Sequence, residues 1–348
     1  MRISKIILVS LVIVLLSAGL ALGYKISGSP MQRRAKEPSA EEVRRAKDNL
    51  DTTNPFTGDD PLHIIVFGID KTATNDATAE GNPSRSDVIM LLTIDPVTKK
   101  AQLLSLPRDT YVDIEGHKGK TKLGHAYAYA YGGEELAEQT VEDFLDVDID
   151  YYATVDYDSV KRLVDAVGGI EVDIPFDYSY EDTYVVPHLY IDFKKGKQTL
   201  NGEDAVRYLR IRKIYENQDI DRIQAQQGFL MQLFQKVKQP IMILKIPELI
   251  DIMLDNVETN LTYGQIAYLA KMGLEFDKGD IQTDTLVGEN TRIGNIEYYI
   301  VDRETAREQL RRFSAGKGSY YDEVQEQKER AQEGSDQTDN DSAQYVDE

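Results

Sequence analysis

From residue 62 to about residue 313, short runs of aliphatic and β-branched residues alternate with stretches of helical periodicity, and this alternation restricts the fold most strongly. Runs typical of strands cover 64–67, 88–94, 101–106 and 170–174. Helical periodicity covers 134–145, 159–167, 219–237, 247–254 and 262–272. Strands and helices that intermix in this way predict an α/β or α+β sandwich.

Two local signals predict connections within this body. The turn residues 96–99 lie between the second and third strand-like runs, which predicts a β-hairpin. Gly168 and Gly169 directly follow the helical stretch 159–167 and are typical of a helix C-cap.

The N-terminus carries a nearly unbroken apolar stretch from Ile6 to Leu22. With the next two residues it reaches the roughly 20 residues that a membrane-spanning helix needs. A cleaved signal peptide is the alternative, because Ala21-Leu22-Gly23 resembles a cleavage site. The stretch is longer than the ~7–15 residue core of a signal peptide, so we predict an uncleaved anchor. The short segment before it favours a cytoplasmic N-terminus and an exported body.

The chain divides where its composition changes. We expect residues 1–26 to form a short cytoplasmic tail and a transmembrane anchor, 27–60 an extracytoplasmic stalk, and 61–315 the folded catalytic domain. Residues 316–348 contain ten acids, three bases and almost no aliphatic side chains. A segment of this composition cannot bury a core, so we predict that it is a disordered acidic tail.

Charge and residue types limit the classes of function. A net charge of −20 argues against nucleic acid as a partner, because phosphate backbones are bound by cationic surfaces. The chain has no cysteine and only four histidines, which excludes thiolate chemistry and argues against a zinc site. Any bound metal is therefore expected to be held by carboxylates, which favours Mg²⁺ or Mn²⁺.

Arginines stand beside acids or beside each other at four places in this acidic chain. The four clusters are Arg85-Ser86-Asp87, Pro107-Arg108-Asp109, Arg210-Ile211-Arg212 and Asp219-Ile220-Asp221-Arg222. A guanidinium group presents a planar fork of donors that pairs with phosphate oxygens. The clusters therefore predict a site for a polyphosphate group with a divalent cation. Arg85 and Arg108 flank the strands of the predicted hairpin, so both can reach one edge of the sheet.

These clusters belong to a longer series of motifs. In chain order the series is Gly68-Ile69-Asp70, Arg85-Ser86-Asp87, Leu106-Pro107-Arg108-Asp109, 122–133, 164–172, 200–205, Tyr208-Leu209-Arg210-Ile211-Arg212 and 219–227. The series closely resembles the LytR-CpsA-Psr family of Gram-positive cell-envelope proteins over about residues 62–310. No single motif is diagnostic, whereas the set agrees in order and spacing.

The resemblance implies an α/β/α sandwich whose central mixed sheet and helices enclose a pocket for a polyprenyl tail. It implies a phosphotransferase that moves a glycopolymer such as teichoic acid or capsule from a polyprenyl-pyrophosphate carrier to a peptidoglycan sugar hydroxyl. It also implies one N-terminal span in the cell membrane with the catalytic domain outside. Two alternatives stay open, namely a pyrophosphatase that hydrolyses polyprenyl pyrophosphates and a non-catalytic sensor of the lipid intermediate.

The resemblance also assigns roles to residues. Asp70 and Asp87 match magnesium-associated carboxylates. The pyrophosphate-binding positions are matched by Arg85, Arg108, Arg210, Arg212, Asp219, Arg222 and Gln226. The expected catalytic group is Asp87, Arg108 and Asp109. Asp109 is either the general base for the acceptor hydroxyl or an orienter of Arg108, and we favour the orienter.

Three residues depart from the pattern of the family. Gly124 stands where asparagine is common, Asp221 where a small residue is common, and Ala225 where arginine or asparagine is common. The additional acid at Asp221 would weaken anion binding unless it faces solvent or pairs with Arg222. An Asp–Arg pair on a helix is usually a surface ion pair of little energetic value, so Asp219 and Arg222 owe their assignment to the series of motifs.

Overall fold

The computed structural model describes Glu41, Arg45 and residues 53–56, 58–69, 86–128, 132–182, 188–211, 219–328 and 330. The predicted anchor at 1–26 lies outside these ranges. None of the helices within them is long and apolar enough to cross a membrane.

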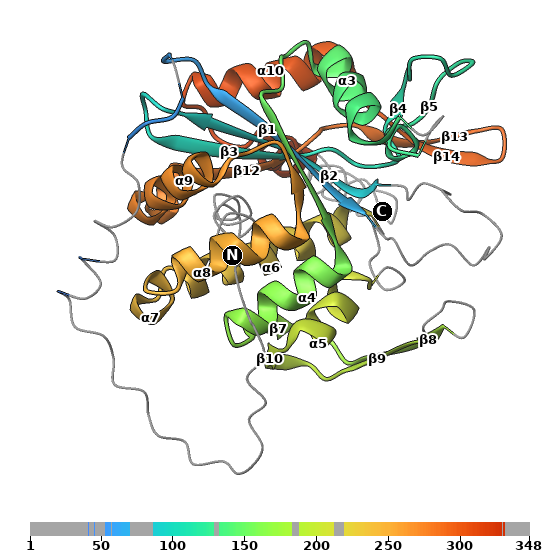
Figure 1. The fold of residues 1–348 in the computed structure, drawn as a ribbon. Coiled ribbons are helices and arrows are strands. Elements are labelled where there is room, and N and C mark those ends of the chain that lie inside the picture. Colours follow the sequence, from blue (N-terminus) through green and yellow to red (C-terminus); the bar gives the residue numbers. More distant parts are fainter. Residues whose placement is uncertain are drawn as a thin grey trace, which may run out of the picture.

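Within the described ranges, a six-stranded mixed sheet forms the centre of the fold (Figure 1). Its strands, in spatial order, are β11 (Glu258–Thr259), β6 (Tyr151–Asp156), β1 (Leu62–Ile69), β2 (Ser86–Asp95), β3 (Lys100–Ser105) and β12 (Ile281–Thr285). β1 is parallel to β6 and β3 is parallel to β12, whereas the other neighbours are antiparallel. The antiparallel β2–β3 pair confirms the predicted hairpin.

Both faces of this sheet are buried, as the continuous apolar run in β1 predicts. Successive side chains of a strand point to opposite faces. Ile64 and Val66 belong to one apolar core, whereas Ile65 and Phe67 belong to the other, and each of the four is at most 2% exposed. A strand that is apolar on both faces needs a helical layer on each.

Helices supply these two layers (Figure 1). One face is covered by α3 (Gly133–Leu145) and α10 (Arg303–Ser314). The other face is covered by α4 (Tyr157–Ala166), α5 (Gly202–Leu209), α6 (Asp219–Val237), α7 (Pro240–Ile243), α8 (Ile246–Asn256) and α9 (Tyr263–Glu275). This arrangement confirms the expected α/β/α sandwich with a mixed sheet. Gly168, with φ of 77°, and Gly169, with φ of 88°, follow α4 as the predicted C-cap.

Smaller elements complete the described fold. The two-stranded antiparallel sheets and short helices are β4 (Tyr111–Val112) with β5 (Thr121–Lys122), β7 (Ile170–Ile174) with β10 (Gly196–Leu200), β8 (Tyr178–Asp182) with β9 (Leu189–Phe193), β13 (Glu289–Ile293) with β14 (Ile296–Ile300), η1 (Leu123–His125) and η3 (Lys278–Asp280). The sequence patterns predicted only β7 among these elements.

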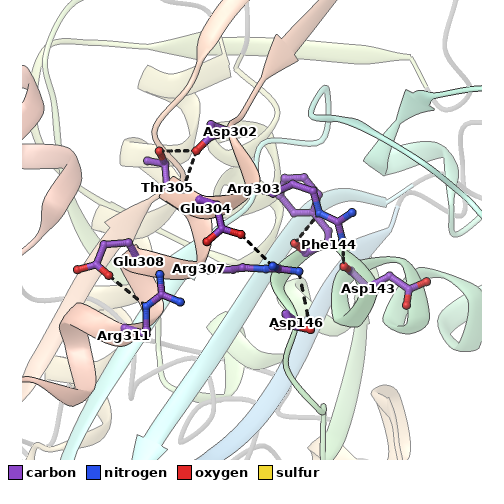
Figure 2. Close-up of polar contacts among 10 residues, drawn as sticks. All are labelled: Asp143, Phe144, Asp146, Asp302, Arg303, Glu304, Thr305, Arg307, Glu308 and Arg311. Atoms are coloured by element: carbon purple, nitrogen blue, oxygen red, sulfur yellow. Dashed lines mark hydrogen bonds and ion pairs between the residues drawn. The ribbon is translucent and has the colours of Figure 1, made fainter.

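Polar contacts tie α10 to the end of α3 (Figure 2). The last four carbonyl groups of a helix lack partners within the helix. Arg303 donates hydrogen bonds to the carbonyl oxygens of Asp143 and Phe144 in the last turn of α3. The guanidinium group of Arg307 lies 3.7 Å from the carboxylate of Asp146, which directly follows α3. The two helices of this layer are therefore joined at the α3 C-terminus.

The C-terminal segment corrects one prediction. Residues 320–328 are helical, and Ser319, just before them, is 1% exposed. Asp284 in β12 accepts hydrogen bonds from the Ser319 hydroxyl and from the main-chain nitrogens of Tyr320 and Tyr321, each at 3.1 Å. The prediction of disorder from residue 316 is therefore wrong for residues 319–328. A buried carboxylate on a distant strand orders this segment, and local composition carries no signal of that contact.

Candidate active site

An apolar cavity lies between the central sheet and helices α4, α5 and α6. It holds about 710 Å³ of empty space, counting its open mouth. Its apolar lining consists of Val66, Ile69, Val88, Met90, Val155, Val160, Leu209 and Leu230. Asp87, Arg222 and Gln226 also line it, and the same three residues line a small second cavity that reaches Arg108. Most of the cavity wall is therefore apolar. Asp87, Arg222 and Gln226 form a polar part that it shares with the second cavity.

The sheet places these polar residues at one edge. Ile69 at the end of β1 pairs with Ser86 at the start of β2 and with Asp156 at the end of β6. The β2–β3 hairpin brings the segment after β3, which carries Arg108, to this edge. Arg85 lies outside the described residues. Its neighbour Ser86 is the first residue of β2, at the edge that we predicted Arg85 and Arg108 to reach.

Arg108 and Asp87 form the centre of the site. Nη1 of Arg108 donates to Oδ1 of Asp87 at 2.5 Å. Nη2 of Arg222 donates to the main-chain oxygen of Asp87 at 3.5 Å, and Arg222 is only 3% exposed. Burying a cation is costly unless anions and acceptors surround it. A positive charge held beside the cavity therefore suits an anionic ligand.

Asp109 lies between two side chains, Arg108 and Lys122. Its Oδ1 atom lies 3.0 Å from Nζ of Lys122 and 3.9 Å from Nε of Arg108. Its main-chain oxygen accepts a hydrogen bond from the nitrogen of Tyr299 at 2.8 Å. Asp109 thus lies between two cations, an arrangement that suits an orienter of Arg108.

Gly124 holds the backbone of Arg108 in place. Its nitrogen donates to the main-chain oxygen of Arg108 at 2.8 Å. A Cβ atom at this position would lie 2.8 Å from the main-chain oxygen of Ser86 and 3.0 Å from Cβ of Arg108. Contacts this short to backbone force a displacement. Glycine at position 124, where asparagine is common in the family, therefore has a steric reason. The turn that contains Gly124 packs directly on the segment that carries Arg108.

Arg210 approaches the cavity from the side of α5. Its guanidinium carbon lies 5.3 Å from the ring centre of Tyr157, which lines the cavity. Arg210 is the C-cap of α5, with φ of −91° and ψ of −2°. The backbone at Arg210 is therefore helical and not extended. Arg212 lies outside the described residues.

The remaining predicted residues divide into two groups. Gln226 is 7% exposed and lines both cavities, as expected for a site residue. Ala225 packs against the apolar core, which accounts for a small side chain there. Asp219 is the first residue of α6. The side chains of Asp219 and Asp221, and all of Asp70, lie outside the described part, so the predicted metal pair is represented by Asp87 alone.

The sequence reasoning missed Lys122, Tyr157 and Gln227. Lys122 opens the motif 122–133, but its contact with Asp109 depends on the β4–β5 pairing. Gln227 is 6% exposed and donates to the hydroxyl of Ser105 at 2.8 Å, which joins α6 to β3. A second glutamine directly after Gln226 was the available signal.

No group of three or more histidine, cysteine, aspartate or glutamate side chains is placed to hold a metal among the described residues. The carboxylate of Asp87 is a ligand type that Mg²⁺ accepts, and it lies where the two cavities meet. This position is compatible with a metal that is shared with a bound anion.

The fold and the site together define a class of protein with an apolar cavity between a mixed sheet and a helical layer, and with Asp87, Arg108 and Arg222 beside that cavity. The sequence profile of the LytR_cpsA_psr family matches residues 26–314. The chain belongs to this family, as its motifs predicted.

Relatives and solved structures agree with this assignment. The chain is 36% identical over 253 residues to the polyisoprenyl-teichoic acid–peptidoglycan teichoic acid transferase TagV of Bacillus subtilis (strain 168). The match covers 72% of this chain and 63% of that protein. The crystal structure of B. subtilis TagV superposes with a TM-score of 0.58 at 32% identity, covering 73% of this chain and 97% of that chain. A structure of TagT bound to LI-WTA superposes with a TM-score of 0.56 at 25% identity, covering 74% and 93%.

Proposed function

We propose that this protein is a phosphotransferase that moves a phosphate-linked anionic glycopolymer, of the teichoic acid or capsule type, from a polyprenyl-pyrophosphate carrier to a peptidoglycan sugar hydroxyl. The observation that carries the proposal is the apolar cavity that meets the Arg108–Asp87 pair and the buried Arg222. A polyprenyl tail is apolar and a pyrophosphate is anionic, so one cavity complements both parts. The similarity to TagV, whose name describes a transfer of this kind, supports the same conclusion.

The arginines act on the charge that moves during transfer. The acceptor hydroxyl attacks the phosphorus on the saccharide side, and the bond from that phosphorus to the bridging oxygen breaks. Polyprenyl phosphate leaves with the electron pair, and the hydroxyl proton passes to a base or to water. Guanidinium groups that are already in place stabilise the leaving phosphate without reorganisation. Arg108 and Arg222 hold such positions from the segment after β3 and from α6.

We propose Mg²⁺ as the cofactor, with Mn²⁺ as a substitute, held by Asp87 together with Asp70. When bound, the ion neutralises charge on the pyrophosphate oxygens. Arg108 donates a hydrogen bond to Oδ1 of Asp87, which fixes this carboxylate beside the cavity and supports the proposal.

The apolar stretch 6–22 and a lipid-linked substrate support a membrane location. We propose a single span with a cytoplasmic N-terminus and with the catalytic domain on the extracytoplasmic side of the cell membrane. The apolar tail of the carrier then stays close to the bilayer while its head group reaches the site.

The test uses the full chain in detergent with Mg²⁺ and a polyprenyl-pyrophosphate saccharide labelled in the saccharide. Label is followed with and without peptidoglycan oligomers, for the wild type and for Asp87→Ala. Label that moves onto peptidoglycan only with the wild type supports the transferase. Label that is released as soluble sugar phosphate indicates a hydrolase, and tight binding without turnover indicates a sensor; either outcome contradicts the proposal.

Gly124→Ala is expected to lower the transfer rate at least tenfold and to lower the free energy of unfolding by about 1–3 kcal/mol, as overpacking does. The added methyl group meets the backbone of Ser86 and the Cβ atom of Arg108, so the displacement falls on the guanidinium group at the centre of the site. Transfer assays and thermal unfolding of the full chain measure the two effects.

Gly264→Ala is the matched control, because a Cβ atom there, in α9, meets nothing within 4 Å. Alanine also favours a helix more than glycine does, so this variant should be unchanged or slightly more stable. An active, fully stable Gly124→Ala protein would show that the close approach is not needed.

A further inference from the structure

Two β-hairpins lie beside the candidate active site. The β4–β5 and β13–β14 hairpins are neighbours at one end of the molecule (Figure 1). Thr110 forms a parallel β-bridge with Tyr299, and the nitrogen of Tyr299 donates to the main-chain oxygen of Asp109 at 2.8 Å. The β13–β14 hairpin is therefore attached to the residue that follows Arg108.

Three side chains of these hairpins form a partly exposed surface, which we call the tyrosine platform: Tyr111, Lys122 and Tyr298. The ring centres of Tyr111 and Tyr298 lie 4.7 Å apart. Nζ of Lys122 lies 5.8 Å from the ring centre of Tyr298 and 3.0 Å from Oδ1 of Asp109. The platform thus runs from two aromatic rings through a cation to Asp109, which lies beside Arg108.

The hairpins that carry the platform pack on one face of the sheet, and the apolar cavity lies on the other. Val112 and Tyr299, which neighbour the platform in the chain, belong to the core under α3 and α10. The cavity residues Met90 and Leu230 belong to the core on the opposite face. Arg108 lies at the edge between them. In-line phosphoryl transfer requires that the attacking oxygen arrives opposite the leaving oxygen. With the lipid carrier in the cavity, the acceptor has to come from the other side, where the platform lies.

We propose that the tyrosine platform binds the acceptor, a glycan strand of peptidoglycan, and positions its hydroxyl toward Arg108. This inference rests on the proposed function. Sugar rings have apolar C–H faces that pack on aromatic rings, and they carry hydroxyl groups that accept from a lysine. Tyr111 and Tyr298 supply amphipathic rings, and Lys122 supplies donors next to the reaction centre.

A membrane surface is the other occupant to consider, because Ile293 and Ile296 near the hairpin turn are 42% and 51% exposed. The same hairpin carries the exposed acids Glu289 and Glu297 and one exposed base, Arg292, which pairs with Glu297 at 2.7 Å. Acidic side chains are repelled by an anionic lipid surface, which attracts Lys and Arg instead. The β13–β14 hairpin has no net positive charge that would draw it to such a surface, so we choose the glycan as the occupant.

The experiment measures the KM for a peptidoglycan oligosaccharide and the KM for the lipid donor separately, with the full chain. Tyr298→Ala is expected to raise the acceptor KM roughly tenfold, as loss of one aromatic anchor does, and to leave the donor KM unchanged. Tyr298→Phe retains the ring and should stay close to the wild type. Tyr190→Ala is the matched control, because Tyr190 is 53% exposed on β9 of another hairpin.

A titration of the oligosaccharide into the Asp87→Ala chain measures acceptor binding without turnover. Adding Tyr298→Ala or Tyr111→Ala to that chain should weaken binding by a similar factor, and circular dichroism checks that each variant is folded. Unchanged acceptor KM and affinity in folded variants of an active transferase would overturn the platform and leave the proposed function standing. A wild type that moves no label onto peptidoglycan would instead overturn the proposed function. Loss of binding to anionic vesicles, with acceptor affinity intact, would make the hairpin a membrane contact.

Discussion

Arg108→Lys is expected to lower the transfer rate about 10²–10³-fold while the protein stays folded, which is the usual cost of removing one prepositioned donor from a transition state. Lysine keeps the charge but loses the planar fork, so it cannot hold Asp87 and a phosphate oxygen in the fixed geometry that the guanidinium group provides. The 2.5 Å contact between Arg108 and Asp87 shows that one arm of the fork is already engaged. Transfer of labelled saccharide to peptidoglycan measures the rate, and circular dichroism measures the fold.

Arg311→Lys is the matched control for this prediction. Arg311 lies on α10, its side chain is 60% exposed, and it pairs with Glu308 of the same helix. An exposed pair of this kind contributes little, so the control should retain wild-type activity. Arg108→Lys activity within twofold of the wild type would show that only the positive charge matters and would contradict the bidentate role.

The sequence predicted the elements whose apolar patterns are complete within themselves. β1 is apolar over the whole run 64–67, and α6 covers 219–237 as its periodicity indicated. β6 and β12 were missed, although both lie in the central sheet. Their sequences, YYATVD and IQTDT, mix polar and apolar residues, and pairing with β1 and β3 decides their conformation. Tertiary context overrides a weak local β-propensity in such strands.

The candidate site was predictable where its residues lie at or just beyond the ends of strands. Asp87 and Arg108 come together because the hairpin turn fixes which ends meet. The contact between Lys122 and Tyr298 joins two hairpins that are far apart in the chain. Gly294-Asn295 is a two-residue turn signal for the second hairpin, but no local pattern predicts that the two hairpins meet. The helical backbone at Arg210 was equally hidden, because the family motif gives residue identity and not conformation.

Asp284→Ala is expected to release the C-terminal segment 319–328 and to lower the free energy of unfolding by about 1–3 kcal/mol, the cost of leaving a buried donor without an acceptor. Asp284 is 3% exposed and accepts three hydrogen bonds from Ser319, Tyr320 and Tyr321. Detachment lets water solvate these donors, which limits the loss. Hydrogen exchange of residues 319–328 and denaturant unfolding measure the two effects. Asp113→Ala, at an exposed acid paired with Lys120, is the control and should change neither.

The loss of unfolding free energy in Asp284→Ala is expected to depend on pH. Burial raises the pKa of Asp284, although its hydrogen-bond donors act in the opposite direction. The folded protein therefore holds the proton more tightly than the unfolded chain does. The stability that this proton contributes is complete below the ordinary pKa of 3.8 and is lost as the pH rises through the raised value. The difference in stability between the wild type and Asp284→Ala should shrink from acidic to neutral pH. A difference that grows with pH would show that the donors, and not burial, dominate, and that the ionised carboxylate is what holds the segment on β12.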